Sequence, residues 1–199
     1  MLTDKVYSIR LGHAGFSYSN TRIIRTDIPA ECVGSTHEYY NVGSGICGID
    51  DLWIEDIGDG GCKTDKFHRD IVFLSEDVRQ NPNNARAHFY LANSYRDTRQ
   101  WERAIEHYTK RIELGGWDEE VWNSFYSIGK CYKEEDKMPE AINAWLEGYN
   151  YHPQRAENIY ELVNTYRNAG KNELASMFYK WGKMIPKPDA ILFLHTDVY

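Results

Sequence analysis

Three stretches of the sequence share one pattern of residues, and this repetition constrains the fold more than any other feature. Each copy begins with an apolar pair, and a tyrosine, an alanine and a second aromatic residue follow at fixed distances. The anchors are Leu91, Tyr95, Ala104 and Tyr108; Ile128, Tyr132, Ala141 and Trp145; and Leu162, Tyr166, Ala175 and Tyr179. The copies are offset by 37 and 34 residues. A recurring period of this length predicts a stack of similar units.

These anchors resemble those of the tetratricopeptide repeat, in which each unit is a pair of antiparallel helices. In that family the alanine lies where the two helices cross closely. Helix breakers stand where the pattern requires them: Pro153 follows the second copy, Gly170 divides the third, and Asn81-Pro82-Asn83-Asn84 precedes the first. We therefore expect a mostly α solenoid. Its predicted parts are a half-repeat over 64–83, repeats over about 85–116, 122–153 and 156–188, and a partial cap over 189–199.

Residues 1–62 follow a different pattern, rich in Gly, Ser, Thr and Ile. Alternating runs such as KVYSIRL, TRIIRTD and DLWIEDI predict strands. The segments GHAG, SYSN, NVGSGICG and GDGG predict the turns between them. The sequence therefore predicts a small β-rich segment over 1–62 and a helical array over 63–199.

Composition excludes several classes of function. The net charge of −7 argues against a general nucleic-acid binder, which usually carries a basic excess. No apolar run is long enough to span a bilayer, and the first residues do not resemble a signal peptide. The four cysteines lack zinc-ligand spacing, so we expect free thiols in a cytoplasmic protein.

The first helices of the predicted repeats should line a concave groove with their outward positions. These positions are Arg86, Phe89, Asn93 and Arg96; Asn123, Tyr126, Lys130 and Lys133; and Glu157, Tyr160, Asn164 and Arg167. The set holds five cations, three aromatic residues and three asparagines. Cations and amide donors suit an acidic or carboxylate-ended protein or peptide ligand. The alternative is that these positions are ordinary solvated helix faces.

A second resemblance joins the β-rich segment to the repeats. Its motifs are Arg22 and Arg25, the stretch Gly34-Ser35-Thr36-His37-Glu38, the run from Asp59 to Asp70, Asn81-Pro82-Asn83-Asn84, and Phe89-Tyr90-Leu91-Ala92-Asn93-Ser94-Tyr95. In this order they resemble the C-terminal end of a family 2 glycosyltransferase domain followed by tetratricopeptide repeats. The resemblance implies sugar transfer from a nucleotide-diphosphate sugar with Mn²⁺ or Mg²⁺ as cofactor.

The resemblance also implies roles for individual residues. His37 and Glu38 would be catalytic, near the diphosphate and the acceptor. Arg25, Lys63 and Lys66 would offer positive charge on the donor side. Asp56 stands where relatives often carry a histidine and could be a metal ligand. The rival interpretation of His37-Glu38 is an ordinary turn.

The family's N-terminal half, with its nucleotide-binding units and Asp-x-Asp motif, has no counterpart in this sequence. We therefore expect the chain alone to lack a complete donor site, with the missing half as a possible partner. Two other interpretations stay open. The chain could be a stand-alone adaptor whose β-rich segment only caps the array, or a remnant that retains no activity.

Overall fold

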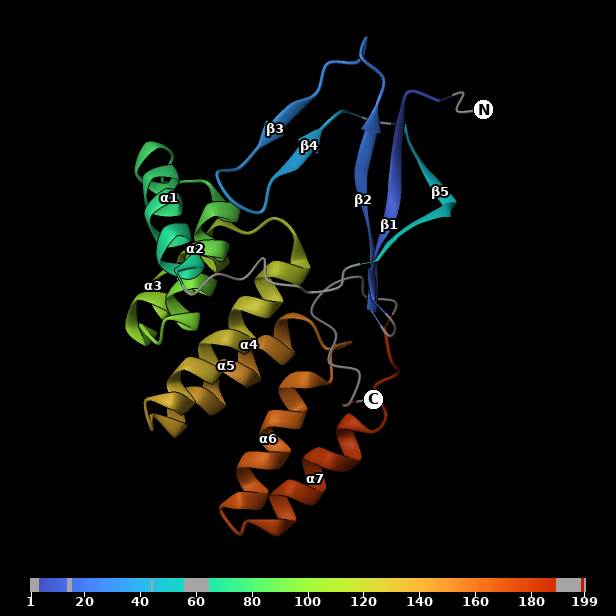
Figure 1. The fold of residues 1–199 in the computed structure, drawn as a ribbon. Helices are drawn as coiled ribbons and strands as arrows, with labels where there is room; N and C mark the ends of the chain where they lie inside the picture. Colours follow the sequence, from blue (N-terminus) through green and yellow to red (C-terminus); the bar gives the residue numbers. More distant parts are fainter. Residues whose placement is uncertain (1–3, 14–15, 44, 56–64, 189–197, 199) are drawn as a thin grey trace. The chain divides into compact units, whose positions relative to one another are not determined.

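The computed structural model describes residues 4–13, 16–43, 45–55, 65–188 and 198 (Figure 1). The chain divides into two compact units, Met1–Lys66 and Phe67–Tyr199, and each is described by itself. The sequence placed this boundary between residues 62 and 63. The first unit holds strands and the second holds helices, as the change in sequence pattern predicted.

The first unit contains a three-stranded sheet in the order β2-β1-β5. The central strand β1 (Val6–His13) pairs antiparallel with β2 (Phe16–Ile24) and parallel with β5 (Ile46–Glu55). The side chains of Val6, Ile9 and Leu11 on this central strand are buried. A hairpin of β3 (Glu31–Val33) and β4 (Tyr39–Asn41) forms a second, two-stranded sheet.

The predicted turn over SYSN is wrong, since residues 17–20 lie inside β2. Tyr18 pairs with Leu11 and Asn20 pairs with Ile9 in the antiparallel ladder. The intrinsic turn preference of serine and asparagine is weak compared with a continuous ladder against a buried central strand. Tertiary pairing therefore overrides local propensity in this segment.

The second unit contains one leading helix and three helical hairpins among its described residues. They are α1 (Lys66–Gln80), α2 (Ala85–Asp97), α3 (Trp101–Leu114), α4 (Asp118–Glu134), α5 (Met138–Tyr151), α6 (Glu157–Asn168) and α7 (Asn172–Gly182). The hairpins are α2–α3, α4–α5 and α6–α7, and each packs against the next. Leu74 of α1 is buried in the core of the first hairpin. The predicted mostly α solenoid with a small β-rich segment is confirmed, while the predicted cap over 189–199 lies almost entirely outside the described residues.

The repeated anchors form the cores of the hairpins. Ala104 and Ala141 are fully buried at the helix crossings. The aromatic anchors Tyr108 and Trp145 are also fully buried, but Tyr179 in the third copy is 58% exposed. Its neighbour Phe178 packs into the core instead. In the third hairpin the buried aromatic residue therefore stands three residues after the alanine instead of four.

The three hairpin turns are built alike. In each turn one residue adopts a left-handed backbone conformation: Arg99 with φ 59°, Asp136 with φ 57° and Gly170 with φ 70°. The amide of the following residue donates to the carbonyl of the anchor tyrosine, at 2.8, 2.9 and 2.9 Å for Tyr95, Tyr132 and Tyr166. This bond closes the C-terminus of a helix and fixes the direction of the next one.

Buried and half-buried ion pairs join the hairpins to one another. Arg111, near the end of α3, donates to Glu120 at 3.0 Å, and both side chains are buried. The neighbouring Glu119 is paired with Arg155, which precedes α6 and also binds Glu157 at 2.8 Å. Adjacent glutamates of α4 therefore hold the hairpins on either side of it.

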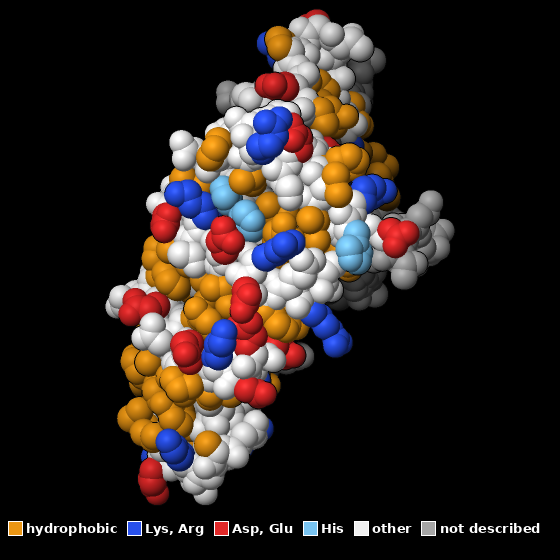
Figure 2. Space-filling view, turned by 90° about the vertical axis from the view of Figure 1, so that its left-hand side faces the viewer, with side chains coloured by type: hydrophobic (Ala, Val, Ile, Leu, Met, Phe, Trp, Pro, Cys, Tyr) orange, Lys and Arg blue, Asp and Glu red, His pale blue; other side chains and the backbone are white. Residues whose placement is uncertain are grey.

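Figure 2 shows one face of the molecule, on which hydrophobic side chains reach the surface in patches between charges of both signs. No wide field of a single sign covers the described part of this face. None of the described helices is both long and apolar enough to cross a bilayer.

Candidate functional site

A pocket of about 420 Å³ lies between the first helices of the first two hairpins. We call it the α2/α4 pocket. It is lined by Asn93, Arg96 and Asp97 of α2 and by Asn123, Tyr126, Ser127 and Lys130 of α4. These residues recur at three- and four-residue intervals, so each set lies on one face of its helix. Five of the seven belong to the groove predicted from the sequence.

Hydrogen bonds fix the direction of both asparagine amides in the pocket. The hydroxyl of Tyr108 donates to Asn93 Oδ1 at 2.6 Å, and the hydroxyl of Ser127 donates to Asn123 Oδ1 at 3.3 Å. Burial raises the pKa of Tyr108 well above its ordinary range, which keeps the phenol protonated as a donor. No described residue accepts a hydrogen bond from the Nδ2 group of either asparagine. The pocket therefore offers two amide donors.

The charged groups of the pocket are partly satisfied by one another. Arg96 pairs with Asp97 at 2.8 Å and donates to the Tyr108 hydroxyl at 3.2 Å. Lys130 lies with Nζ 5.4 Å from the centre of the Tyr126 ring. Within the described ranges Lys130 forms no ion pair. The pocket thus keeps one uncompensated cation beside its amide donors.

The predicted groove is less positive than its five cations suggested. Arg86 lies 3.6 Å from Glu120 and packs over Tyr90, and Lys133 lies 3.3 Å from Glu161. Arg167 on α6 is exposed and, in the part of the chain that the structure describes, has no ionic partner. Two of the five predicted cations, Lys130 and Arg167, are therefore available to an anionic ligand.

Two predicted groove positions are wrong. Phe89 is completely buried in the core of the first hairpin, in edge-to-face contact with Tyr108. Glu157 is also completely buried, held by the guanidinium of Arg155. Neither side chain can reach a ligand in the groove. Phe89 is buried because it packs against Tyr108 of α3, and Glu157 is buried because it pairs with Arg155.

The far side of the groove is formed by α6. Tyr160 and Arg167 are exposed there, and Asn164 is half-buried. Glu161 connects this helix to the pocket, since its two carboxylate oxygens accept from the Tyr126 hydroxyl at 3.2 Å and from Lys133 at 3.3 Å. A residue of the third hairpin therefore holds the Tyr126 side chain, which lines the α2/α4 pocket, in place.

Asp97 and Ser127 line the pocket but were not predicted. Ser127 stands four residues after Asn123, so a hydroxyl–amide pair on one helix face could have been found from this spacing. Asp97 gave no comparable signal. Asp97 is the last residue of α2, and its carboxylate accepts a hydrogen bond from the preceding Arg96.

The residues expected to act in sugar transfer lie in the first unit and at the start of α1. His37 and Glu38 are exposed in the loop between β3 and β4. His37 has a positive φ of 53°, and Gly34 in the same loop has a φ of 100°. This geometry is that of a tight turn, and the catalytic role of His37 and Glu38 stays a prediction.

The expected donor-side residues are not brought together. Arg25 is held by the exposed Asp27, whose carboxylate it binds at 2.5 and 2.9 Å. Lys66 begins α1, and Lys63 and Asp56 lie outside the described residues. Among the described residues, no three His, Cys, Asp or Glu side chains gather where they could hold a metal ion. The expected Mn²⁺ or Mg²⁺ site therefore stays a prediction.

No family model matches the sequence, and no curated protein matches it. Several solved structures are similar in fold. The crystal structure of MamA protein has a TM-score of 0.53 and 18% identity, and the match covers 58% of this chain and 62% of that one. MamA 41-end from Desulfovibrio magneticus RS-1 has a TM-score of 0.52 and 11% identity, with coverage of 60% and 66%.

A chain of the APC/C hetero-tetramer Cut9–Hcn1 is also similar, with a TM-score of 0.51 and 15% identity over 61% of this chain and 22% of that one. The chain therefore spans less than two thirds of each of these proteins. At such low identity the likeness establishes the fold alone, a tetratricopeptide-type helical solenoid. It provides no evidence for the expected transferase activity.

Proposed function

We propose that the helical unit is an adaptor module that binds an acidic peptide segment of a partner protein along α2, α4 and α6. The observation that carries this proposal is the donor set of the α2/α4 pocket. Asn93, Asn123 and Lys130 all line one pocket of about 420 Å³, and the Oδ1 atoms of both asparagines already accept hydrogen bonds, which leaves their Nδ2 groups as the donors. Donors of this kind match the oxygens of a carboxylate.

Arg167 extends the same chemistry to the third hairpin. It lies on α6 beyond the exposed Tyr160, so a second acidic group of an extended peptide would find a cation there. The ring of Tyr160 would pack against the peptide side chain that lies between the two acidic groups. Specificity would come from the fixed amides, while the exposed cations would mainly accelerate encounter and respond to salt.

The test is binding of a fluorescein-labelled peptide, Ser-Gly-Asp-Glu-Tyr-Glu-Asp, to the full chain by fluorescence anisotropy. The control peptide replaces each Asp and Glu by Asn and Gln. We expect Lys130→Glu and Arg167→Glu each to weaken binding by about tenfold or more, since each puts a like charge beside the ligand. Asn93→Asp should act similarly, because it exchanges an amide donor for a carboxylate oxygen of the same size.

Lys180→Glu on α7 is the matched control, since it makes the same charge change at an exposed residue outside the groove. It should change affinity by less than about twofold. Equal binding of the two peptides would contradict the proposal. So would unchanged affinity in both Lys130→Glu and Arg167→Glu.

A further inference from the structure

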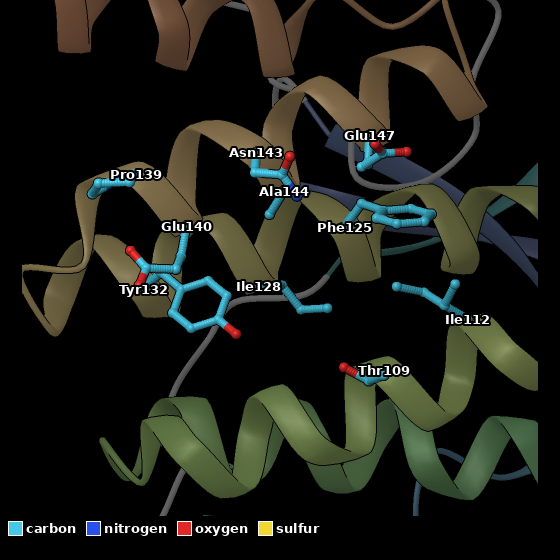
Figure 3. Close-up of a pocket in the computed structure, with 10 residues that line it drawn as sticks. All are labelled: Thr109, Ile112, Phe125, Ile128, Tyr132, Pro139, Glu140, Asn143, Ala144 and Glu147. Carbon is cyan, nitrogen blue, oxygen red and sulfur yellow. The ribbon is translucent and has the colours of Figure 1, made fainter.

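A second groove, on the other side of α4, shares no residue with the α2/α4 pocket. We call it the α3/α5 groove. It has a volume of about 490 Å³ and lies between α3 and α5 over α4 (Figure 3). Figure 3 shows Thr109 and Ile112 of α3 on one side, Glu140 and Glu147 of α5 on the other, and Ile128 of α4 between them. This volume suits a few side chains of a partner rather than a whole domain.

The floor of the groove is apolar. Ile112, Phe125, Ile128 and Ala144 come from three different helices and converge there. Phe125 and Ile128 are three residues apart, whereas Tyr126 and Ser127 between them line the α2/α4 pocket. The helix α4 therefore presents two different surfaces, a hydrogen-bonding one and an apolar one. An open apolar floor favours a partner that inserts apolar side chains.

The rim of the groove is acidic. Glu140 and Glu147 are both exposed and stand seven residues apart on α5. Seven residues make two helical turns, so the carboxylates lie on one face about 10 Å apart along the axis. Neither forms an ion pair with any described residue. The nearby Lys110 is occupied by Glu113 at 3.0 Å, and Lys137 by Glu135 at 3.1 Å.

We propose that the α3/α5 groove is a second docking site, which takes a basic amphipathic helix of a partner protein. Its apolar side chains would enter over Ile112, Ile128 and Ala144. Two Lys or Arg residues seven positions apart would pair with Glu140 and Glu147. Charge complementarity selects this partner, because an apolar floor beside two unpaired carboxylates disfavours an acidic or neutral one. The site is independent of the proposed acidic-peptide groove.

The probe is a fluorescein-labelled peptide in which Lys-Ala-Leu-Leu-Ala-Ala-Leu-Lys is flanked by Ala and Gln residues that raise its helix content. A second peptide carries Gln in place of both Lys. Anisotropy titrations use the full chain. We expect saturable binding of the Lys peptide and at least about tenfold weaker binding of the Gln peptide.

Two protein variants test the site itself. Glu140→Gln with Glu147→Gln removes the rim charges, and we expect about tenfold weaker binding. Asn143→Arg places a cation three residues after Glu140 and four before Glu147, where it would pair with both in cis. It should weaken binding at least as much while leaving the thermal midpoint unchanged or raised, which separates loss of the site from loss of the fold.

Glu134→Gln with Glu173→Gln is the matched control. Both residues are exposed, lie outside the groove and, in the described chain, form no ion pair, so this pair makes the same charge change elsewhere. It should leave affinity within about twofold of the original. Lys130→Glu should also leave the affinity for the Lys peptide within about twofold of the original.

Three results would overturn the proposal. One is the absence of saturable binding of the Lys peptide. Another is equal binding by the original protein, the Glu140/Glu147 variant and Asn143→Arg. The third is self-association in sedimentation runs that Asn143→Arg abolishes while the peptide fails to bind, which would assign the groove to a second copy of this chain.

Discussion

Gly129 of α4 lies so close to the indole of Trp145 of α5 that a Cβ atom on Gly129 would stand 2.2 Å from the Trp145 Nε1 atom. The same indole N–H donates to the carbonyl of Tyr126 at 3.2 Å. In the first copy of the repeat, the corresponding residues are Ala92 and Tyr108, and both are fully buried. The largest ring of the three copies is thus matched with the smallest residue.

This contact predicts that Gly129→Ala destabilises the protein. The new methyl group must displace Trp145 and strain its hydrogen bond, and we expect a loss of about 2 kcal/mol in the free energy of unfolding. Urea denaturation monitored by circular dichroism measures it. Combining the change with Trp145→Leu should cost less than the sum of the two single changes. Strict additivity would show that the two residues are not in contact.

The left-handed residues of the hairpin turns predict an order of stabilities. Arg99→Gly should raise the free energy of unfolding by about 0.5–1 kcal/mol, because a non-glycine residue is strained at this backbone conformation. Asp136→Gly should gain less, since Asp tolerates the conformation better. Gly170→Ala should lose about 1 kcal/mol although open space surrounds that position. Thermal denaturation of the three variants tests the order, and a gain from Gly170→Ala would contradict it.

Two neighbouring histidines predict a dependence of stability on pH. The Nδ1 atoms of His88 and His107 lie 2.9 Å apart. Burial lowers the pKa of His88, and burial together with its neighbour lowers the pKa of His107 to about 4. Below about pH 6.5 these two histidines therefore become protonated in the unfolded chain while they stay neutral in the folded chain.

Stability from this pair should be fully present above about pH 6.5 and should fall as the pH drops toward 4. We expect His107 to account for about 2 kcal/mol of that loss. The measurement is urea denaturation at pH 7.5, 6, 5 and 4.5. His107→Gln is the comparison, and its profile should be flatter. Parallel profiles would rule out His107 as the source.

The buried guanidinium of Arg155 predicts a large effect on stability. It stacks 3.7 Å from the centre of the Trp122 ring and binds Glu157, with all three side chains fully buried. Arg155→Met should cost about 3–5 kcal/mol, because it leaves Glu157 buried without its cation. Arg155→Lys should restore little of the lost stability, since an ammonium provides neither two parallel N–H donors for the carboxylate nor a flat surface that stacks on Trp122.

Arg167→Met is the comparison for this prediction, because Arg167 is exposed. It should change stability by less than about 0.5 kcal/mol. Chemical denaturation gives both values under one set of conditions. A loss below about 1 kcal/mol for Arg155→Met would mean that the cluster contributes little to the folded state.

The fold could be predicted from the sequence because its main signal is local and repeated. Ala104 and Tyr108 are spaced by helix geometry, Leu91 stands at a fixed distance before them across the hairpin turn, and the recurrence of this pattern reveals where each hairpin begins. The β-rich segment was harder, since the place of SYSN depends on pairing with β1. A strand formed by polar residues leaves little trace in its own composition.

The candidate site was only partly predictable. Periodicity placed Asn93, Tyr126 and Lys130 on one side of their helices, and the structure puts them in one pocket. The burial of Phe89 and the pairing of Lys133 with Glu161 depend on how one hairpin meets the next. The α3/α5 groove likewise arises between hairpins, so no single repeat of the sequence encodes it.

The adjacent residues Glu119 and Glu120 have a consequence for how the array loses its structure. Glu120 is tied to the first hairpin through Arg111, and Glu119 is tied through Arg155 to the chain that leads into the third. In a stack where units touch only their neighbours, cooperativity of unfolding rests on such interfaces. The middle hairpin therefore carries the contacts that couple the unfolding of the two ends of the array. Loosening it would turn a single melting transition into separate steps for each end.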